Sequence, residues 1–141
     1  MGTWDFKVLT NDHALDMMFG LEDIRDIEGM EGLKAHIKKV FHDPESNIDE
    51  LLLSAEIVDI ALNGIDESIL GSLYDYEAFF GEVEKSSIGD LRDEAIRTIE
   101  RIEDIERENN IWVPRMVASR RQLLKKIESR LKTNASDKTG V

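Results

Sequence analysis

The sequence predicts an all-α protein, built as a single compact domain of about five or six helices. Apolar residues recur every three or four positions along most of the chain, which is the spacing of one helix face. Only two prolines and nine glycines interrupt the 141 residues, so long linkers are not expected. With 41% hydrophobic residues, the chain can fill one core. We place the helical domain at residues 1–132 and expect residues 133–141 to form a flexible tail.

The first part of the chain predicts two helices separated by glycines. Asn11 or Asp12 can cap the first helix, and apolar residues follow at helical spacing. Gly20 is expected to weaken or end this helix, because glycine is a poor helix former. A second amphipathic stretch follows Gly29 and Gly32. The first proline of the chain then disfavours helix in the residue before it and ends the stretch.

The segment IDELLLSAEIVDIALNG predicts a central helix. It is the most apolar part of the chain, and its hydrophobic residues cover more than one face, as in helices buried on most sides. Ser46 or Asn47 can cap its start, and Gly64 is expected to end it in the left-handed region. Four of its side chains are expected to be nearly inaccessible to solvent: Leu52, Ala55, Val58 and Leu62.

The second half of the chain predicts short helices followed by two long ones. Gly71 and Gly81 divide residues 66–84, which favours one or two short helices there. A long helix should begin near Ser86, and Pro114 suits the first turn of a last helix. The residues expected on the buried side of that last helix are Val117, Leu124, Ile127 and Leu131.

Charge is divided unevenly along the chain, whose 30 acidic and 18 basic residues give −12. Residues 1–110 hold 28 acidic and 10 basic residues (net −18), and residues 111–141 hold 2 and 8 (net +6). Because an acidic body repels phosphate, we expect no direct nucleic-acid binding there. We expect the basic end to dock on the acidic body, the alternative being a helix that binds a membrane surface or nucleic acid. The acidic surface serves either solubility alone or contact with a basic macromolecule.

No catalytic or ligand-binding motif is present. Glycine-rich phosphate loops, zinc-binding H-E-x-x-H motifs and calcium loops are missing, and there is no cysteine for disulfides or thiolate metal sites. His36 and His42 are six residues apart, whereas helical metal ligands lie three or four apart. We therefore expect no enzyme activity, metal, cofactor or small-molecule substrate. A cytoplasmic location is expected, since no secretory signal or membrane-spanning stretch is found.

Two blocks of the sequence resemble an uncharacterised family of short bacterial proteins, a domain of unknown function. Its members open Met-Gly-x-Trp-Gly, continue to Asn-Asp-x-Ala-x-Asp, and carry Ala-Glu-(Val/Ile)-Val later, which is similar to residues 55–58. Asp5 stands where the family usually has glycine. The resemblance implies no functional residues. We expect Trp4 and Phe6 to bury against the central helix as a clasp. The residues that match the family opening are Gly2, Trp4, Asn11, Asp12, Ala14 and Asp16.

By class, small acidic helical proteins without cysteine or an active site also resemble immunity proteins of contact-dependent growth inhibition and similar polymorphic toxin systems. This resemblance implies that the chain binds a cognate basic protein toxin, often a nuclease, and occludes its active site. A toxin cleft that binds the negative phosphate groups of a nucleic acid is also complementary in charge to the carboxylates of an acidic protein. Two alternatives stay open: a helical adaptor or dimerising regulator, and an enzyme that holds a metal with its acids.

The stretch 66–84 is the first candidate for the partner-binding surface, and the stretch 5–31 is the second. The first combines four aromatic and six acidic residues with no basic residue. Interface cores are enriched in aromatic residues, and a tyrosine can present both its ring and its hydroxyl group to a partner. The residues expected to face the partner are Asp66, Glu67, Tyr74, Asp75, Tyr76, Glu77 and Glu82.

Overall fold

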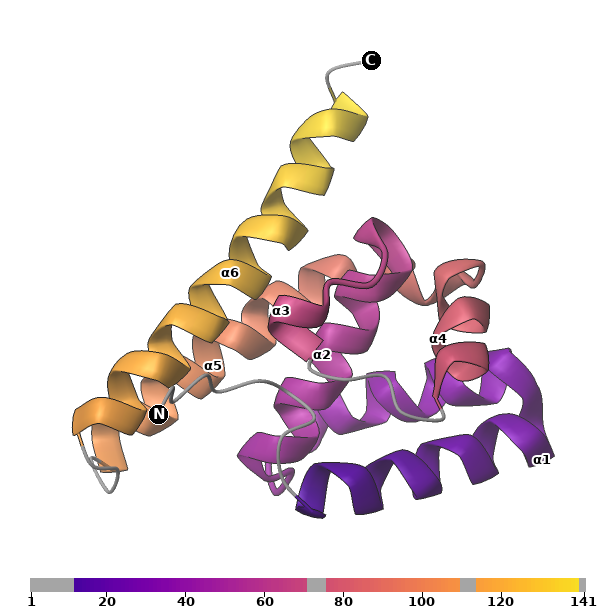
Figure 1. The fold of residues 1–141 in the computed structure, drawn as a ribbon, viewed down its shortest axis with the longest axis horizontal. Helices are drawn as coiled ribbons and strands as arrows, with labels where there is room; N and C mark the ends of the chain where they lie inside the picture. The colour runs from indigo at the N-terminus through magenta and orange to yellow at the C-terminus, as the bar shows by residue number, and fades with distance from the viewer. Residues whose placement is uncertain (1–11, 71–75, 110–113, 140–141) are drawn as a thin grey trace.

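The computed structural model describes residues 12–70, 76–109 and 114–139 (Figure 1). Over these residues the chain is helical with no strand, which confirms the predicted all-α class. The elements in chain order are α1 (Asp12–His42), α2 (Ile48–Asn63), α3 (Glu67–Leu70), α4 (Glu77–Glu84), the 3₁₀ helix η1 (Ser87–Leu91), α5 (Arg92–Asn109) and α6 (Pro114–Thr139).

Helix α2 lies at the centre of the fold and contacts α1, α4, η1, α5 and α6. In Figure 1, α1 lies below it, α4 lies to one side, and α5 and α6 lie to the other. Every residue from Leu51 to Ile60 is buried. The predicted central helix is therefore confirmed, including the burial of Leu52, Ala55 and Val58. Leu62 is only half-buried, because it lies in the last turn of α2, where the surrounding helices no longer enclose it.

Both ends of α2 follow from the residues that flank it. Asn47 forms a capping box: its side-chain oxygen accepts a hydrogen bond from the Glu50 amide at 2.8 Å, and the Glu50 carboxylate accepts one from the Asn47 amide at 3.1 Å. Gly64 ends the helix with φ 85° and ψ 173°. The positive φ agrees with the expected role of glycine, but the extended ψ directs the chain away from the helix instead of into a left-handed turn.

Helix α1 consists of two arms that reverse direction at Gly29, and the second arm runs back over the first (Figure 1). Gly29 has φ 77° and ψ −175°, a conformation that is nearly restricted to glycine. A Cβ atom on Gly32 would clash with the Cβ atom of Glu28, so a second glycine is needed beside the reversal. The first helix does not end at Gly20, as the sequence allowed: it continues through this glycine because its neighbours Met18 and Leu21 are anchored in the core.

The stretch 66–84 contains two short helices, α3 and α4, as predicted. The long helix expected from Ser86 instead begins with one 3₁₀ segment, η1, whose first turn is capped by the Ser86 hydroxyl. A Cβ atom on Gly89 would lie 2.7 Å from Cδ2 of Leu62, so glycine there lets η1 approach α2 closely. Leu91 at the end of η1 then begins a buried stripe that continues along α5 through Ala95, Ile99 and Ile102.

Helix α6 lies beside α5 and packs on the body through an apolar stripe (Figure 1). Its buried residues include Leu124, Ile127 and Leu131, as predicted, whereas the side chain of Val117 lies outside the described residues. The helix continues to Thr139, beyond the boundary expected at residue 132. Within the described part of the chain, no helix is both long enough and apolar enough to cross a bilayer.

Val58→Asp should unfold the protein. Val58 is fully buried in the middle of α2, and an unpaired carboxylate there loses its hydration, at a cost of several kcal/mol or about the whole stability of a small domain. Circular dichroism and urea denaturation would measure the effect. The matched control is Ala35→Asp, which places the same charge on an exposed position of α1 and should fold normally. A Val58→Asp protein with an unchanged urea midpoint would contradict the central position of α2.

The two exposed glycines of α1 should respond oppositely to alanine. Gly29→Ala forces a side chain into a positive-φ conformation and should lower the free energy of unfolding by about 1–3 kcal/mol. Gly20→Ala removes a flexible residue from a regular helix and should raise it by about 0.5–1 kcal/mol, since the new methyl group meets no atom within 4 Å. Urea denaturation of the two variants measures both changes. Equal effects would show that the chain does not reverse at Gly29.

Candidate protein-binding surface

Of the seven residues expected to face a partner, the structure describes five, and these differ in exposure. Glu67, Glu77 and Glu82 are exposed on α3 and α4. Tyr74 and Asp75 lie outside the described residues. Tyr76 is buried, with only 7% of its surface exposed, and its ring packs edge-on against Phe19 with 6.5 Å between the ring centroids. Asp66 is half-buried and binds Arg130. The expected surface therefore keeps its acids on α3 and α4, whereas Tyr76 and Asp66 take part in internal contacts.

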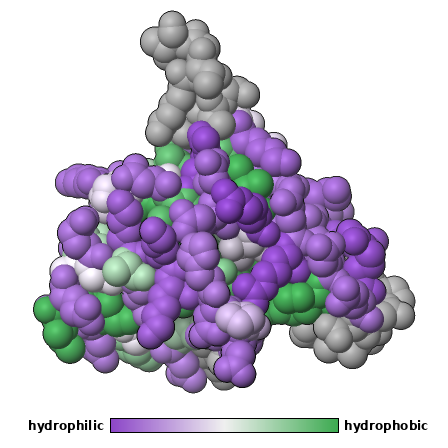
Figure 2. Space-filling view, turned by 180° about the vertical axis from the view of Figure 1, so that it is seen from behind, coloured by the Kyte–Doolittle hydropathy of each residue, from purple (hydrophilic) through white to green (hydrophobic). Residues whose placement is uncertain are grey.

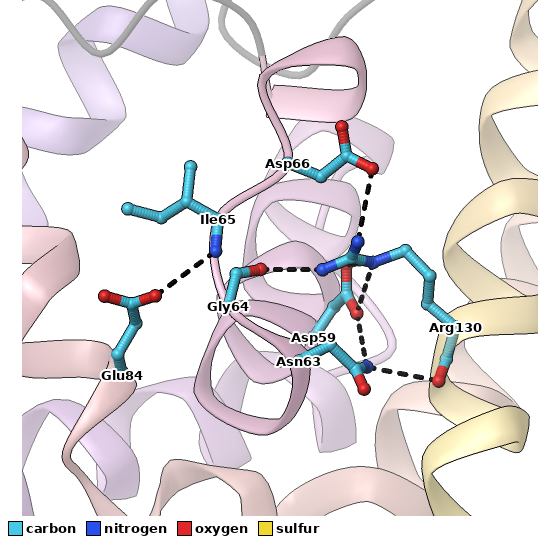
Figure 3. Close-up of polar contacts among 7 residues, drawn as sticks. All are labelled: Asp59, Asn63, Gly64, Ile65, Asp66, Glu84 and Arg130. Atoms are coloured by element: carbon cyan, nitrogen blue, oxygen red, sulfur yellow. Dashed lines mark hydrogen bonds and ion pairs between the residues drawn. The ribbon is translucent and has the colours of Figure 1, made fainter.

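Arg130 of α6 joins three parts of the chain at the end of α2 (Figure 3). Its Nε atom lies 3.0 and 2.9 Å from the two carboxylate oxygens of the fully buried Asp59. Its Nη1 atom lies 3.2 Å from Asp66, and its Nη2 atom donates to the Gly64 carbonyl at 2.6 Å. Asn63 donates to both Asp59 (2.8 Å) and the Arg130 carbonyl (3.1 Å). This cluster fixes α6 on α2 and holds Asp66 in an internal ion pair.

Glu56 lies one turn before Asp59 and is fully buried. Neither of its carboxyl oxygens has a hydrogen-bond partner among the residues that the structure describes. Burial, and then the negative charge of Asp59, raise the pKa of Glu56 well above its ordinary value of 4.5. Glu56 belongs to the Ala-Glu-Ile-Val block that resembles the bacterial family, so this block contributes a buried acid and not a surface residue.

The exposed acids gather instead on the first arm of α1 and on the neighbouring α4. Residues 16–28 carry five acidic side chains and one basic side chain, and residues 77–84 carry three acidic side chains and no basic one. We call this surface the α1–α4 acidic face. Its exposed acids are Asp16, Asp23, Asp26, Glu28, Glu77, Glu82 and Glu84.

Arg25 holds the two parts of the α1–α4 acidic face together. Its guanidinium group lies 3.0 Å from Asp26 on its own helix and 2.9 Å from Glu82 on α4. The same group lies over the Phe79 ring, 5.3 Å from the centroid. Because Arg25 is much less exposed than the carboxylates it binds, it acts as a fixed support beneath the acids. The relative position of the acids on α1 and α4 is therefore set by the fold.

Two large apolar side chains stand exposed on the α1–α4 acidic face. Phe19 is 60% exposed and Ile27 is 82% exposed, and they share the outer side of α1 with Asp16 and Asp23. The sequence pattern had placed Phe19 among the apolar positions of the first helix, and only the fold shows that it points outward. The stretch 5–31, the second candidate from the sequence, contains these residues.

The α1–α4 acidic face combines negative charge with exposed apolar area. Seen from the side opposite to Figure 1, hydrophilic residues cover most of the body and hydrophobic residues reach the surface in small groups (Figure 2). Among the described residues, no three His, Asp or Glu side chains come together in a way that could hold a metal ion. The expected clasp of Trp4 and Phe6 lies outside the described residues.

Comparison with known proteins identifies the family. The domain of unknown function DUF4259 matches residues 2–113, which is most of the chain, and the chain belongs to this family. The match includes the opening residues and the Ala-Glu-Ile-Val block that carried the resemblance noted in the sequence. The comparisons with curated proteins and with solved structures gave no significant match.

Glu56→Gln should stabilise the protein above about pH 5 and flatten the pH dependence of its stability. In the unfolded chain this acid loses its proton near its ordinary pKa of 4.5, whereas the folded protein retains the proton to higher pH. The wild-type free energy of unfolding therefore falls as pH rises from 4.5 toward the raised pKa of the folded state. Glutamine has the same shape and cannot ionise, so this loss disappears.

Urea denaturation of both proteins between pH 4 and pH 8 measures the difference. Glu67→Gln is the matched control, because Glu67 is exposed on α3 and its neutralisation should leave the pH dependence unchanged. Parallel wild-type and Glu56→Gln profiles over this range would show that Glu56 is ionised in the folded protein.

Proposed function

We propose that this DUF4259 protein is a cytoplasmic immunity protein, without catalysis or cofactor, that binds and neutralises a cognate basic protein toxin. The toxin we propose is a nuclease, and the chain would occlude its active site. The observation that carries the proposal is the α1–α4 acidic face: a cluster of exposed carboxylates, supported from beneath by Arg25, with Phe19 and Ile27 exposed among them.

Electrostatics supports a basic protein as the partner. A nuclease cleft is lined with basic groups that bind phosphate, and a rigid array of carboxylates offers the same charge pattern as its substrate. Long-range attraction between the two raises the rate of encounter, and this effect weakens as salt screens the charges. Seven exposed carboxylates on two neighbouring helices supply the negative side of such a pair.

Apolar contacts support a specific complex beyond charge steering. Interface cores depend on a few aromatic and aliphatic residues surrounded by a polar rim. Phe19 and Ile27 have this setting, because acids of the same helix lie on the same outer side. The same two side chains favour a second candidate function, a dimerising adaptor, in which they would contact a second copy of the chain.

Neutralising acids on this face should slow binding to a basic toxin. In the variant Asp23→Asn with Glu77→Gln, we expect the association rate at low salt to fall roughly two- to fivefold, and its dependence on salt to flatten. The partner to use is the basic domain of a large secreted protein encoded beside this chain's gene. Stopped-flow or surface-plasmon kinetics measure the rate, and nuclease assays measure inhibition.

The matched control changes the same charge elsewhere: Glu100→Gln with Glu108→Gln on α5, both exposed. This pair should leave the association rate nearly unchanged. Equal slowing by both pairs would mean that net charge acts without a defined surface. A neighbouring toxin that the wild-type chain neither binds nor inhibits would overturn the proposal, and a tight homodimer without a partner would favour the adaptor.

A further inference from the structure

A surface pocket opens where the two arms of α1 meet α2. Its volume is about 210 Å³, and most of its lining is apolar. Met17, Leu21 and Ile24 come from the first arm of α1, Val40 comes from the second arm, and Leu53 comes from α2. Leu21, Val40 and Leu53 belong to the core, and Met17 and Ile24 pack against it partly buried. The polar part of the lining comes from His36, Glu50 and Ser54.

Gly20 also lines this pocket, and the packing of the described chain does not explain why glycine is there. A Cβ atom at this position would meet no atom within 4 Å, so an alanine would fit. Glycine inside a helix makes the folded protein less stable than alanine would. A glycine at such a position usually permits a turn or the close approach of another group. The helix continues through Gly20 without a turn, which leaves a close approach from outside.

The pocket is continuous with the α1–α4 acidic face through Gly20. Asp16 lies one turn before Gly20 and Asp23 lies nearly one turn after it, and both are exposed. Phe19, the residue before Gly20, is exposed as well. The apolar hollow thus opens beside Gly20, and the exposed carboxylates of Asp16 and Asp23 lie about one turn before and after this glycine along α1.

We propose that this pocket is the anchor site for a single apolar side chain (leucine, methionine or phenylalanine) carried on a basic segment of the partner protein. Lysine or arginine neighbours of that side chain would pair with Asp16 and Asp23. The inference rests on the proposed function in taking the partner to be a basic protein, and it adds the position and the chemistry of the contact.

Size and lining select this occupant over others. Sites for small molecules usually measure about 300–1,000 Å³, so a pocket of about 210 Å³ suits one side chain better than a whole metabolite. The mainly apolar walls favour an apolar group, since a cation placed there would lose its hydration. Binding energy in protein interfaces concentrates in such anchors, and the surrounding charges exclude wrong partners.

Two synthetic peptides test the pocket without the natural partner. One is a 13-residue peptide of lysine and alanine with a single central phenylalanine, and the other has alanine at that central position. We expect the wild-type protein to bind the phenylalanine peptide about tenfold more tightly, as measured by fluorescence anisotropy. Ala35→Met is the matched control: it adds a side chain at an exposed position of α1 that does not line the pocket, and it should keep this preference.

A large side chain at position 20 should fill the pocket and remove the preference for the phenylalanine peptide. The attraction between the basic peptides and the acidic side chains should remain. In Gly20→Met, the two peptides should bind with affinities within about twofold of each other, and the affinity and salt dependence of the alanine peptide should stay at the wild-type level. Gly20→Leu provides a second, independent block. Circular dichroism verifies that each variant is folded.

Three results would overturn the inference: equal binding of the two peptides by the wild-type protein, a full preference retained in both filled variants, or wild-type self-association that Gly20→Met abolishes. If the two peptides bind equally but their binding still depends on salt, the pocket is rejected and the proposed function is not. The opposite combination is also possible. If the filled variants lose the tenfold preference but the wild-type chain does not bind the toxin encoded beside it, the pocket is supported and the immunity function is rejected.

Discussion

The rest of the structure depends on the enclosure of α2. Five other elements pack on this one helix, so its residues from Leu51 to Ile60 have no access to water. Burial stabilises the apolar side chains of α2, but the carboxyl groups of Glu56 and Asp59 are buried with them. A buried carboxylate must be paired or must keep its proton. Asp59 is paired with Arg130, and Glu56 is shifted toward its neutral form.

This constraint explains how the basic end of the chain is used. Helix α6 brings a cluster of positive residues to an acidic body, and one of them, Arg130, enters the fold to bind Asp59, Asp66 and the Gly64 carbonyl. The described residues Arg121, Lys125, Lys126 and Lys132 stay exposed. The helix therefore docks through its apolar stripe and one half-buried arginine, and the other described basic side chains face solvent.

A second arginine organises the contact between α1 and α4. Arg25 binds Asp26 and Glu82 and covers Phe79, so α1 and α4 present their acids in one fixed arrangement. Exposed acids alone would suit a protein that only needs to stay in solution. A glycine inside a regular helix lowers stability, and no contact among the described residues requires glycine at position 20, so solubility does not explain Gly20. Phe19, Ile27 and the pocket add exposed apolar area on the same arm of α1.

The sequence by itself determined the all-α class, the central position of residues 48–63, a cap at Ser46 or Asn47 and one or two short helices in residues 66–84. Apolar spacing and capping are local signals, and the fold follows them. The sequence also placed the second helix after Gly29 and Gly32, but only the tertiary structure decided that the first helix continues through Gly20, because neighbouring packing can hold a glycine in a helix.

Tertiary structure also decided which acids reach solvent. Asp66, Tyr76 and Glu77 belong to one acidic and aromatic stretch of sequence, yet Arg130 binds the first, Phe19 packs against the second, and only the third is exposed. Arg130 and Phe19 each lie more than fifty positions from the residue that they contact, and no local pattern carries that information.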